Sequence, residues 1–300
     1  MRDLSKIQRK NLAIIGAGKV GTAIGHILQR KGVNIAAVAS RSNESLNRAD
    51  QFISGFKTRD VIEASQLANI ILITTNDDQI ERACEIIARE EAFDSEDAVF
   101  HCSGALSTEV LKSAQEKGAS IGAIHPLQSF ATIEGAIDQL PGSVFGITAD
   151  VNVYPLACEI VEALGGTGIM VRDEDKALYH AAACVVSNYF VALVHFAQGL
   201  YRDLGVSEEI ALEALLPLIK GTLSNMEAQG TVLALTGPIA RGDTGPIKEH
   251  LAAFKSRAAE KKKLYCELGE YTSYVALEKG TINRDKQEEL HRLLQGGKVE

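Results

Sequence analysis

The chain has 300 residues, of which 46% are hydrophobic and 23% are charged, a composition that suits one large or two ordinary globular domains with a full core. A net charge of −8 argues against a surface devoted to nucleic acid or to an anionic membrane. The five cysteines are scattered, without a CxxC or Cys/His cluster. The sequence therefore predicts neither a disulfide framework nor a metal site, and a reducing cytoplasm fits best.

The first predicted strand, over residues 12–15, runs into a glycine-rich turn and then a helix over 20–28. Gly16 allows the tight turn, Gly18 lets a pyrophosphate approach the backbone, and Gly21 lets helix and strand pack closely. Free N–H groups and the helix dipole favour an anion there. The alternative is a turn that serves packing alone. The residues expected to bind the cofactor here are Gly16, Ala17, Gly18, Lys19, Val20 and Gly21.

The second predicted strand, over 33–39, ends in Ser40, Arg41 and Ser42. A unit that binds NAD carries an acidic residue near this point, which accepts hydrogen bonds from the ribose. An acid would repel a 2′-phosphate, whereas arginine can pair with it and serine can donate a hydrogen bond. The sequence therefore predicts NADP(H) as the cofactor. The alternative for Arg41 is a solvated loop cation.

The alternation of strands and helices continues to about residue 172, which predicts an α/β Rossmann domain with a doubly wound, mainly parallel sheet. We assign residues 1–172 to this NADP-binding domain. The further strands expected are 55–58, 70–75, 98–102, 119–124, 144–147 and 169–171.

From residue 173 no strand pattern returns, so residues 173–300 are predicted to form an all-α domain for substrate binding and dimerisation. The helices expected in it are 174–204, 207–227, 247–268, 270–279 and 285–294. The stretch 177–201 contains no Asp, Glu, Lys or Arg and is long enough to span a bilayer. Because it carries several polar side chains, we interpret it as a buried central helix rather than a membrane span.

Ligands of doubly wound sheets bind beyond the carboxyl ends of the strands. Two pairs of residues follow predicted strands and are expected to contact the cofactor: Thr75 with Asn76, and Ser103 with Gly104. His125 and Gln128 follow the next strand. We expect His125 to take part in the chemistry or to order its loop, and Gln128 to bind substrate.

Lys176 and His180 are four residues apart and therefore share one helix face, to which Ser187 nearly returns. Hydride transfer needs a proton donor and a group that stabilises charge on the heteroatom of the substrate. Lys176 is the first candidate for the donor, with His180 and His125 in support and Ser187 contacting substrate. The alternatives are a solvated first-turn lysine and a satisfied core histidine.

Arg241 lies in a turn-rich segment between predicted helices. An arginine in such a loop can clamp a substrate carboxylate. It can equally pair with Asp243, two residues later, so both readings stay open here.

Four motifs give the chain a family resemblance: Gly16-Ala-Gly-Lys-Val-Gly21, His125-Pro-Leu-Gln-Ser-Phe130, Lys176-Ala-Leu-Tyr-His-Ala-Ala-Ala183 and Thr236-Gly-Pro-Ile-Ala-Arg-Gly-Asp243. The chain resembles bacterial candidate NADP oxidoreductases that join a Rossmann-like domain to a C-terminal helical domain of unknown function. The resemblance implies the 6-phosphogluconate dehydrogenase-like superfamily, in which the helical domain commonly forms the core of a dimer. β-Hydroxyacid dehydrogenases of that superfamily carry asparagine four residues after the lysine, where this chain has His180.

The sequence thus predicts a cytoplasmic, homodimeric, NADP(H)-dependent oxidoreductase, or dehydrogenase, acting on a small carbonyl, hydroxy-acid or imine compound. Nucleic acid and membranes are not expected partners. Two alternatives stay open: a dinucleotide-binding sensor or scaffold without turnover, and an enzyme that moves hydride between NADP and a second cofactor.

Overall fold

The chain divides into two compact units, Met1–Asn188 and Tyr189–Glu300. The computed structural model describes residues 5–296, so the outer ends of both predicted domains, 1–4 and 297–300, lie outside the described part. The predicted boundary at 172/173 lies two residues after the last strand, which ends at Met170. The first compact unit extends beyond that boundary because it includes the helix that begins at Lys176.

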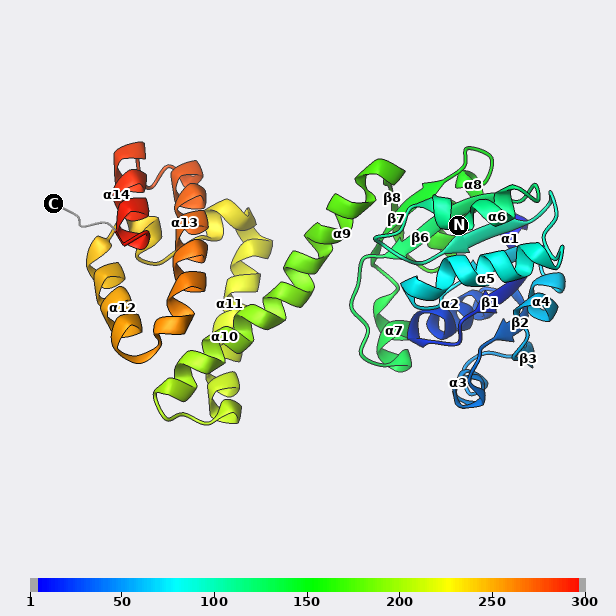
Figure 1. Cartoon of the computed structure of the whole chain (residues 1–300), viewed down its shortest axis with the longest axis horizontal. Helices are drawn as coiled ribbons and strands as arrows, with labels where there is room; N and C mark the ends of the chain where they lie inside the picture. Colours follow the sequence, from blue (N-terminus) through cyan, green and yellow to red (C-terminus); the bar gives the residue numbers. More distant parts are fainter. Residues whose placement is uncertain (1–4, 297–300) are drawn as a thin grey trace. The chain divides into compact units, whose positions relative to one another are not determined.

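An eight-stranded sheet forms the centre of the first unit (Figure 1), in the spatial order β3-β2-β1-β4-β5-β6-β7-β8. Neighbouring strands run parallel except β6 and β7, which are antiparallel. The first six strands have the order of a doubly wound dinucleotide-binding fold, which confirms the predicted fold class. The strands are β1 (Asn11–Ile15), β2 (Asn34–Ala39), β3 (Phe56–Thr58), β4 (Ile70–Ile73), β5 (Ala98–His101), β6 (Ser120–Pro126), β7 (Val144–Ala149) and β8 (Thr167–Met170).

Two layers of helices cover the sheet because successive side chains of a strand point to opposite faces. In β1, Leu12 and Ile14 join one apolar core and Ile15 joins the other. The first core also takes residues of α1 (Ser5–Gln8), α2 (Lys19–Arg30), α3 (Asn43–Ala49), α7 (Ile133–Gln139) and α8 (Tyr154–Ala163). The second takes residues of α4 (Val61–Gln66), α5 (Asp77–Arg89), the 3₁₀ helix η1 (Thr108–Leu111) and α6 (Lys112–Gln115). Burial on both sides explains the continuous apolar runs of the central strands.

Side-chain hydrogen bonds cap two short helical segments of the first unit. Helix α7 was not predicted, although Thr132 caps it by accepting a hydrogen bond from the Gly135 N–H at 2.9 Å. The helical segment after β5 is divided into η1 and α6. The Ser107 hydroxyl caps η1 by accepting a hydrogen bond from the Glu109 N–H.

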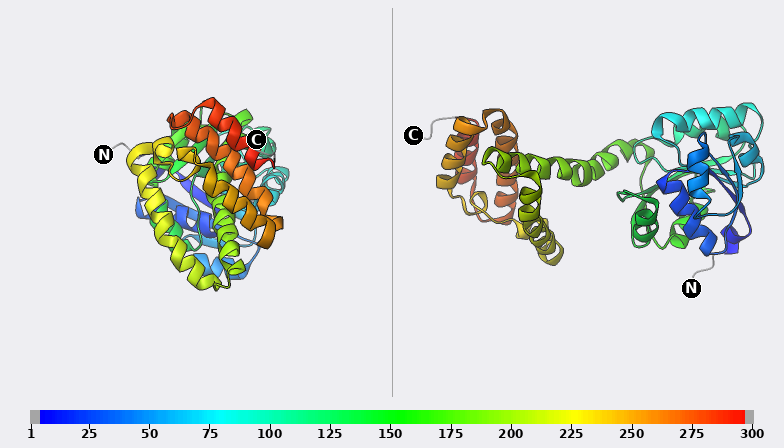
Figure 2. Two further views of the ribbon diagram at one scale, coloured as in Figure 1. Left: turned by 90° about the vertical axis from the view of Figure 1, so that its left-hand side faces the viewer. Right: turned by 90° about the horizontal axis from the view of Figure 1, so that it is seen from below.

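Helices alone make up the described part of the second unit (Figures 1 and 2). Helices α12, α13 and α14 pack side by side around an apolar core that includes Ile247, Ala276 and Leu290. The helical segments from the last strand onward are η2 (Asp173–Asp175), α9 (Lys176–Cys184), the π segment (Val185–Tyr189), α10 (Phe190–Asp203), α11 (Glu208–Ala234), η4 (Ile239–Arg241), α12 (Thr244–Arg257), η5 (Ala259–Lys261), α13 (Lys262–Lys279) and α14 (Arg284–Leu294).

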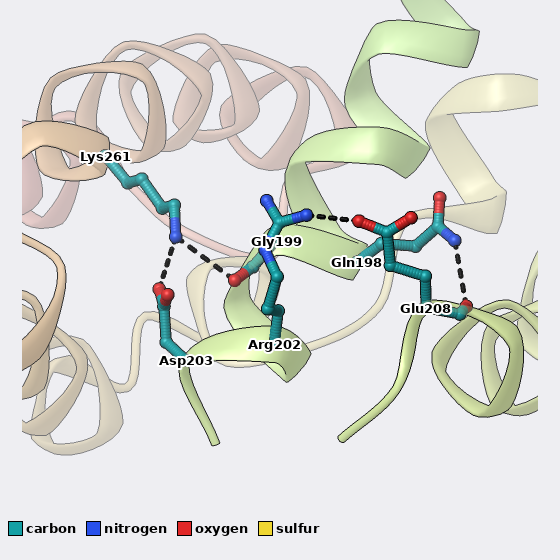
Figure 3. Close-up of polar contacts among 6 residues, drawn as sticks. All are labelled: Gln198, Gly199, Arg202, Asp203, Glu208 and Lys261. Atoms are coloured by element: carbon teal, nitrogen blue, oxygen red, sulfur yellow. Dashed lines mark hydrogen bonds and ion pairs between the residues drawn. The ribbon is translucent and has the colours of Figure 1, made fainter. Parts of the chain in front are cut away.

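Polar contacts join the end of α10 to its neighbours (Figure 3). The Lys261 ammonium bonds the carboxylate of Asp203 and the Gly199 carbonyl. Arg202 pairs with Glu208, whose backbone carbonyl also accepts a hydrogen bond from the Gln198 side-chain amide. The contacts with Glu208 fix the turn between α10 and α11, and those of Lys261 hold η5 against the end of α10.

The prediction of one helix over 247–268 is wrong. The chain leaves helical geometry at Ala258, where φ is −152° and ψ is 50°. Ala258 is buried, and Phe254 packs on Tyr265 across this break, with ring centroids 4.8 Å apart. Tertiary packing therefore ends α12 at a point where the sequence carries neither glycine nor proline.

The prediction that 177–201 is a buried central helix is also wrong for the single chain. Leu178, Val186 and Val191 are 77%, 74% and 68% exposed. By length and composition alone, the helical stretch Asp173–Asp203 is apolar enough to cross a membrane. An apolar helix face of this size is typical of a surface that another molecule covers.

Candidate functional site

The glycine turn between β1 and α2 combines a tight turn at Gly16, open space at Gly18 and close packing at Gly21, as the sequence predicts. Gly16 has φ of +117°, and a Cβ on it would lie 2.7 Å from the backbone of Thr74. A Cβ on Gly21 would lie 2.2 Å from the Thr74 hydroxyl oxygen and 2.4 Å from the Gly16 carbonyl. Around Gly18, by contrast, no described atom lies within 4 Å of such a Cβ. Packing therefore requires two of the glycines, while the third leaves room for an outside group at the helix N-terminus.

A cleft of about 1170 Å³ lies against this turn. Its walls come from the glycine turn, α3, the chain after β4, the chain after β5 and the start of α7. The residues lining it that the sequence assigned to the cofactor are Gly18, Lys19, Val20, Thr75, Asn76 and Ser103. Elements far apart in the sequence thus meet at the carboxyl edge of the sheet, where ligands of this fold bind.

A second pocket, of about 780 Å³, shares Gly18 and the chain from Thr74 to Asn76 with the first. Ser40, Arg41 and Ser42 lie in its wall, as do Gly16 and Ala17 of the glycine turn. Gly21 and Gly104, also assigned to the cofactor, line neither pocket. The Thr75 hydroxyl, which is buried, has no hydrogen-bond partner within residues 5–296. A buried hydroxyl without a partner at the meeting of two pockets fits a bound molecule with polar groups.

Three arginines contribute to the second pocket. Arg41 donates a hydrogen bond to the Gln79 side-chain oxygen at 3.0 Å, and Arg59 donates from its Nε atom to the Arg41 carbonyl at 3.1 Å. Arg82 lies one helical turn after Asp78 on α5. Three guanidinium groups around one pocket favour a doubly charged phosphate. Arg59 and Arg82 were missed because each stands alone in the sequence, outside any phosphate motif.

Some residues assigned to the cofactor also have structural contacts. Ser42 caps α3 by accepting a hydrogen bond from the Ser45 N–H. Asn76 occupies the cap position of α5 without a side-chain cap bond. Asp77, in the first turn of the same helix, accepts a hydrogen bond from the Ser103 hydroxyl at 2.8 Å.

The Ser103–Gly104 turn after β5 connects the first cleft to a group of basic side chains. The Ser103 hydroxyl accepts hydrogen bonds from the N–H groups of Ala105 and Leu106, so it shapes the turn. The Ser103 backbone N–H donates to the His101 Nδ1 atom at 3.1 Å, which fixes that ring. The Ser103 carbonyl accepts a hydrogen bond from the Lys176 Nζ atom at 3.2 Å.

Lys176, at the start of α9, is only 2% exposed. Burial lowers the pKa of its ammonium group, and the nearby carboxylates of Asp173 and Asp77 only partly oppose that effect. A buried lysine with a lowered pKa is better suited to proton transfer near neutral pH than a solvated one. The reading of Lys176 as a solvated cation is therefore wrong.

His125 on β6 and His180 on α9 meet over Gly104, with ring centroids 6.0 Å apart. A Cβ on Gly104 would lie 2.7 Å from the His125 ring and 2.8 Å from the His180 ring. The His125 Nδ1 atom lies 3.0 Å from the Tyr179 hydroxyl oxygen. Burial, with the charges of His180 and Lys176, lowers the pKa of His125 to about 4.

His101 lies fully buried at the end of β5, and burial lowers its pKa to about 3. Its Nε2 atom has no hydrogen-bond partner among the described residues. Cys184 lies 3.8 Å from the His180 Nδ1 atom. Burial raises the pKa of the Cys102 thiol to about 12, so this side chain is not a nucleophile at neutral pH.

The remaining predicted substrate residues are not brought together with this group by any described contact. Gln128 is exposed in the loop after β6 and bonds the Ser129 N–H with its own side-chain oxygen. Ser187 lies in the π segment. Arg241 is exposed at the end of η4 in the second unit, where Asp243 caps α12 by accepting the Gly245 N–H.

Two family models together match most of the chain, with residues 127–142 between the two matches. Residues 2–126 match the Rossmann-like domain, and residues 143–272 match a domain of unknown function, DUF2520. A curated NADP(+) ketol-acid reductoisomerase of Psychrobacter sp. is 37% identical over 76 residues. That match covers 25% of this chain and spans only 22% of the length of that enzyme.

Solved structures resemble the chain over most of its length. Protein TM1727 from Thermotoga maritima is 26% identical, with a TM-score of 0.72, over 90% of this chain and 99% of that one. The candidate NADP oxidoreductase BF3122 from Bacteroides fragilis is 23% identical, with a TM-score of 0.68, over the same shares. A pyrroline-5-carboxylate reductase from Coxiella burnetii shares the fold at 18% identity and a TM-score of 0.57, over 90% and 98%. The chain therefore carries a Rossmann-like domain followed by a domain of the DUF2520 family, as its motifs predicted.

Proposed function

We propose that the protein is an NADP(H)-dependent oxidoreductase that transfers hydride to or from a small carbonyl, hydroxy-acid or imine substrate. The single observation that carries this proposal is the position of Ser103. It lines the cleft beside the glycine turn, and its carbonyl accepts the hydrogen bond of the buried Lys176. A candidate proton donor and a candidate dinucleotide cleft thus share one residue.

NADP(H) is the cofactor that the two pockets fit best. The open space at Gly18 and the N-terminus of α2 suit a pyrophosphate. Arg41, Arg59 and Arg82 in the second pocket suit a 2′-phosphate. Relatives point to the same cofactor: the structure of a pyrroline carboxylate reductase from Plasmodium falciparum has NADP bound, at 14% identity and a TM-score of 0.57.

The bound nicotinamide supplies the hydride. Lys176 gives or takes the proton of the substrate heteroatom, because burial holds its pKa below that of a free lysine. His180 and His125, over Gly104, orient the substrate or stabilise its charge. Gln128, Ser187 and Arg241 contact the substrate, with Arg241 holding an acidic group.

The protein works as a homodimer, whose second copy covers the apolar side chains that α9 and α10 expose. Leu178, Val186 and Val191 belong to this apolar face. Apolar contact areas of this kind are typical of permanent interfaces. The protein works in the cytoplasm, since all five cysteines are free thiols, a state that a reducing compartment preserves.

Titration with NADPH and with NADH, followed by the fluorescence of the reduced nicotinamide, tests the proposal first. The background is low because the chain contains no tryptophan. Tight binding of NADPH with weak binding of NADH supports the proposal and justifies a reductase screen of keto acids and cyclic imines. Binding of neither would overturn the cofactor role and with it the oxidoreductase.

A further inference from the structure

The hydroxyl oxygen of Tyr179, on α9, lies close to residues of both β6 and β7. This oxygen lies 3.0 Å from the His125 Nδ1 atom, and the two rings meet edge to face at 88°. Gly146 is the cross-strand partner of His125 in the β6–β7 pair. A Cβ on Gly146 would lie 2.7 Å from the Tyr179 hydroxyl oxygen, so the phenol rests directly on the β7 backbone.

The direction of the Tyr179–His125 hydrogen bond follows from the protonation of the phenol. Burial raises the pKa of Tyr179, so the phenol keeps its proton at neutral pH. The phenol has one proton of its own to give. Among the described residues, the hydrogen-bond partner that can accept it is the His125 Nδ1 atom.

A neutral imidazole that accepts at Nδ1 carries its proton on Nε2. The Nε2 edge of His125 is the edge that faces Gly104, since a Cβ there would lie 2.7 Å from both Nε2 and Cε1. Ser103, the residue before Gly104, lines the cofactor cleft. The N–H of His125 is therefore presented beside the cleft, with the His180 ring as its neighbour.

We infer that His125 is a neutral hydrogen-bond donor whose Nε2–H holds an oxygen atom of the substrate, and that Tyr179 is the positioning residue that fixes this tautomer. The inference rests on the proposed function and deepens it. A neutral donor next to the Lys176 ammonium suits a carbonyl or carboxylate oxygen. It does not suit a protonated imine, which has no lone pair to offer and would meet the positive charge of Lys176.

Nitrogen-15 NMR of the full-length protein labelled in its histidines tests the inference without cofactor or substrate. The His125 signals are identified by their loss in His125→Gln. At neutral pH we expect the pattern of an Nε2-protonated neutral ring in the wild type. A ring protonated at Nδ1, or charged at both nitrogens, would overturn the inference.

Tyr179→Phe removes the hydroxyl and keeps the ring. We expect the His125 signals to move toward a mixture of tautomers, while the rest of the spectrum stays folded. Tyr265→Phe is the matched control, because Tyr265 also bonds a histidine Nδ1 atom, that of His250, at 2.8 Å in the second unit. It should leave the His125 signals unchanged. An unaltered His125 tautomer in Tyr179→Phe would show that Tyr179 is not the positioning residue.

The NMR result does not depend on whether the proposed function is correct. NMR reports the His125 tautomer whether or not the protein binds NADPH, whereas the nicotinamide titration reports binding whatever the tautomer is. Once a substrate is found, His125→Gln should keep more turnover than His125→Asn, because the glutamine amide can place an N–H near Nε2 and the asparagine amide cannot. Equal losses in the two variants would contradict the donor role of Nε2.

Discussion

The Lys176 ammonium donates a hydrogen bond to the Ser103 carbonyl at 3.2 Å, across 73 residues of chain. The contact ties the first turn of α9 to the turn after β5, which lines the cofactor cleft. It places this buried ammonium against a carbonyl dipole, and the carboxylates of Asp173 and Asp77 offset the effect of burial on its pKa only in part. A lysine held in this way is easier to deprotonate than one in a salt bridge.

Lys176→Met should abolish most turnover while leaving NADPH binding intact. Loss of a general acid typically costs about 10²–10⁴-fold in rate, and methionine fills a similar volume. The measurement is kcat with a substrate from the reductase screen, beside the nicotinamide titration. Lys112→Met is the control, since Lys112 is an exposed residue paired with Glu109 on the surface. Full activity in Lys176→Met would remove Lys176 from the mechanism.

Two glycines of the β1–α2 turn should respond in opposite ways to alanine. Gly18→Ala adds a methyl group where no described atom lies within 4 Å, so the Tm should stay unchanged while NADPH affinity falls by about tenfold or more. Gly21→Ala forces contact with the Thr74 hydroxyl and the Gly16 carbonyl. It should cost about 1–3 kcal/mol of stability. Thermal unfolding measures the Tm of both variants, and titration with NADPH measures their affinity for the cofactor. A loss of Tm in Gly18→Ala would contradict the open space at that turn.

Arg41→Ala should weaken NADPH binding and leave NADH binding nearly unchanged. The guanidinium lies in the second pocket with Arg59 and Arg82, and a charge-assisted contact to phosphate is worth about 1.5–3 kcal/mol. Arg59→Ala should shift the same ratio in the same direction. Arg30→Ala, at the opposite end of α2 from the glycine turn, is the control. Equal losses for both nucleotides would mean that Arg41 does not read the 2′-phosphate.

His101 should make the protein less stable in acid. Its pKa is about 3 in the folded protein against an ordinary value of 6.5, so below pH 6.5 the unfolded chain binds one more proton at this residue. The free energy of unfolding then falls as the pH falls, by about 1.4 kcal/mol per pH unit from His101 alone. The contribution is absent above pH 6.5 and levels off below about pH 3.

His101→Asn should flatten this acid dependence, since asparagine does not titrate and its side-chain oxygen can still accept the Ser103 N–H. Urea unfolding at pH 7 and at pH 5 measures the difference. His125, with a pKa of about 4, keeps its own share of the slope in this variant. A slope identical to that of the wild type would show that His101 is not a buried neutral histidine.

Val191→Asp should convert the proposed dimer to a monomer. The side chain is 68% exposed in the single chain and belongs to the apolar face of α10. A carboxylate there would be buried without a partner in the dimer interface. Val151→Asp is the control, because Val151 is 86% exposed in the loop after β7. Analytical ultracentrifugation gives the mass of each variant. A wild type that sediments as a monomer would refute the dimer.

The sheet and its order could be predicted because each strand carries its own apolar run. Residues such as Ile70–Ile73 are buried on both faces, and nothing further along the chain changes that pattern. Each predicted strand occurs within two residues of its expected ends. The break at Ala258 could not be predicted, because it depends on how Phe254 meets Tyr265.

The site was predictable where a motif fixes the backbone and not where distant side chains meet. The spacing of Gly16, Gly18 and Gly21 is enough to predict the glycine turn between β1 and α2. The Tyr179–His125 contact joins residues 54 apart, and spacing along one helix singled out Lys176 and His180 while leaving Tyr179 unassigned. Exposure of the 177–201 face was missed because a sequence does not state whether neighbours or a second molecule cover it.

Lys176, His125, Tyr179 and His180 all belong to the first compact unit, although three of them lie on a helix whose continuation, from Tyr189, belongs to the second. The change of unit falls inside the π segment, where the backbone winding is irregular. The proposed acid–base group is therefore contained in one unit. A lineage could reshape the chain beyond Asn188, which holds Arg241 and the exposed side chains of α10, without rebuilding the proposed proton donor and its neighbours.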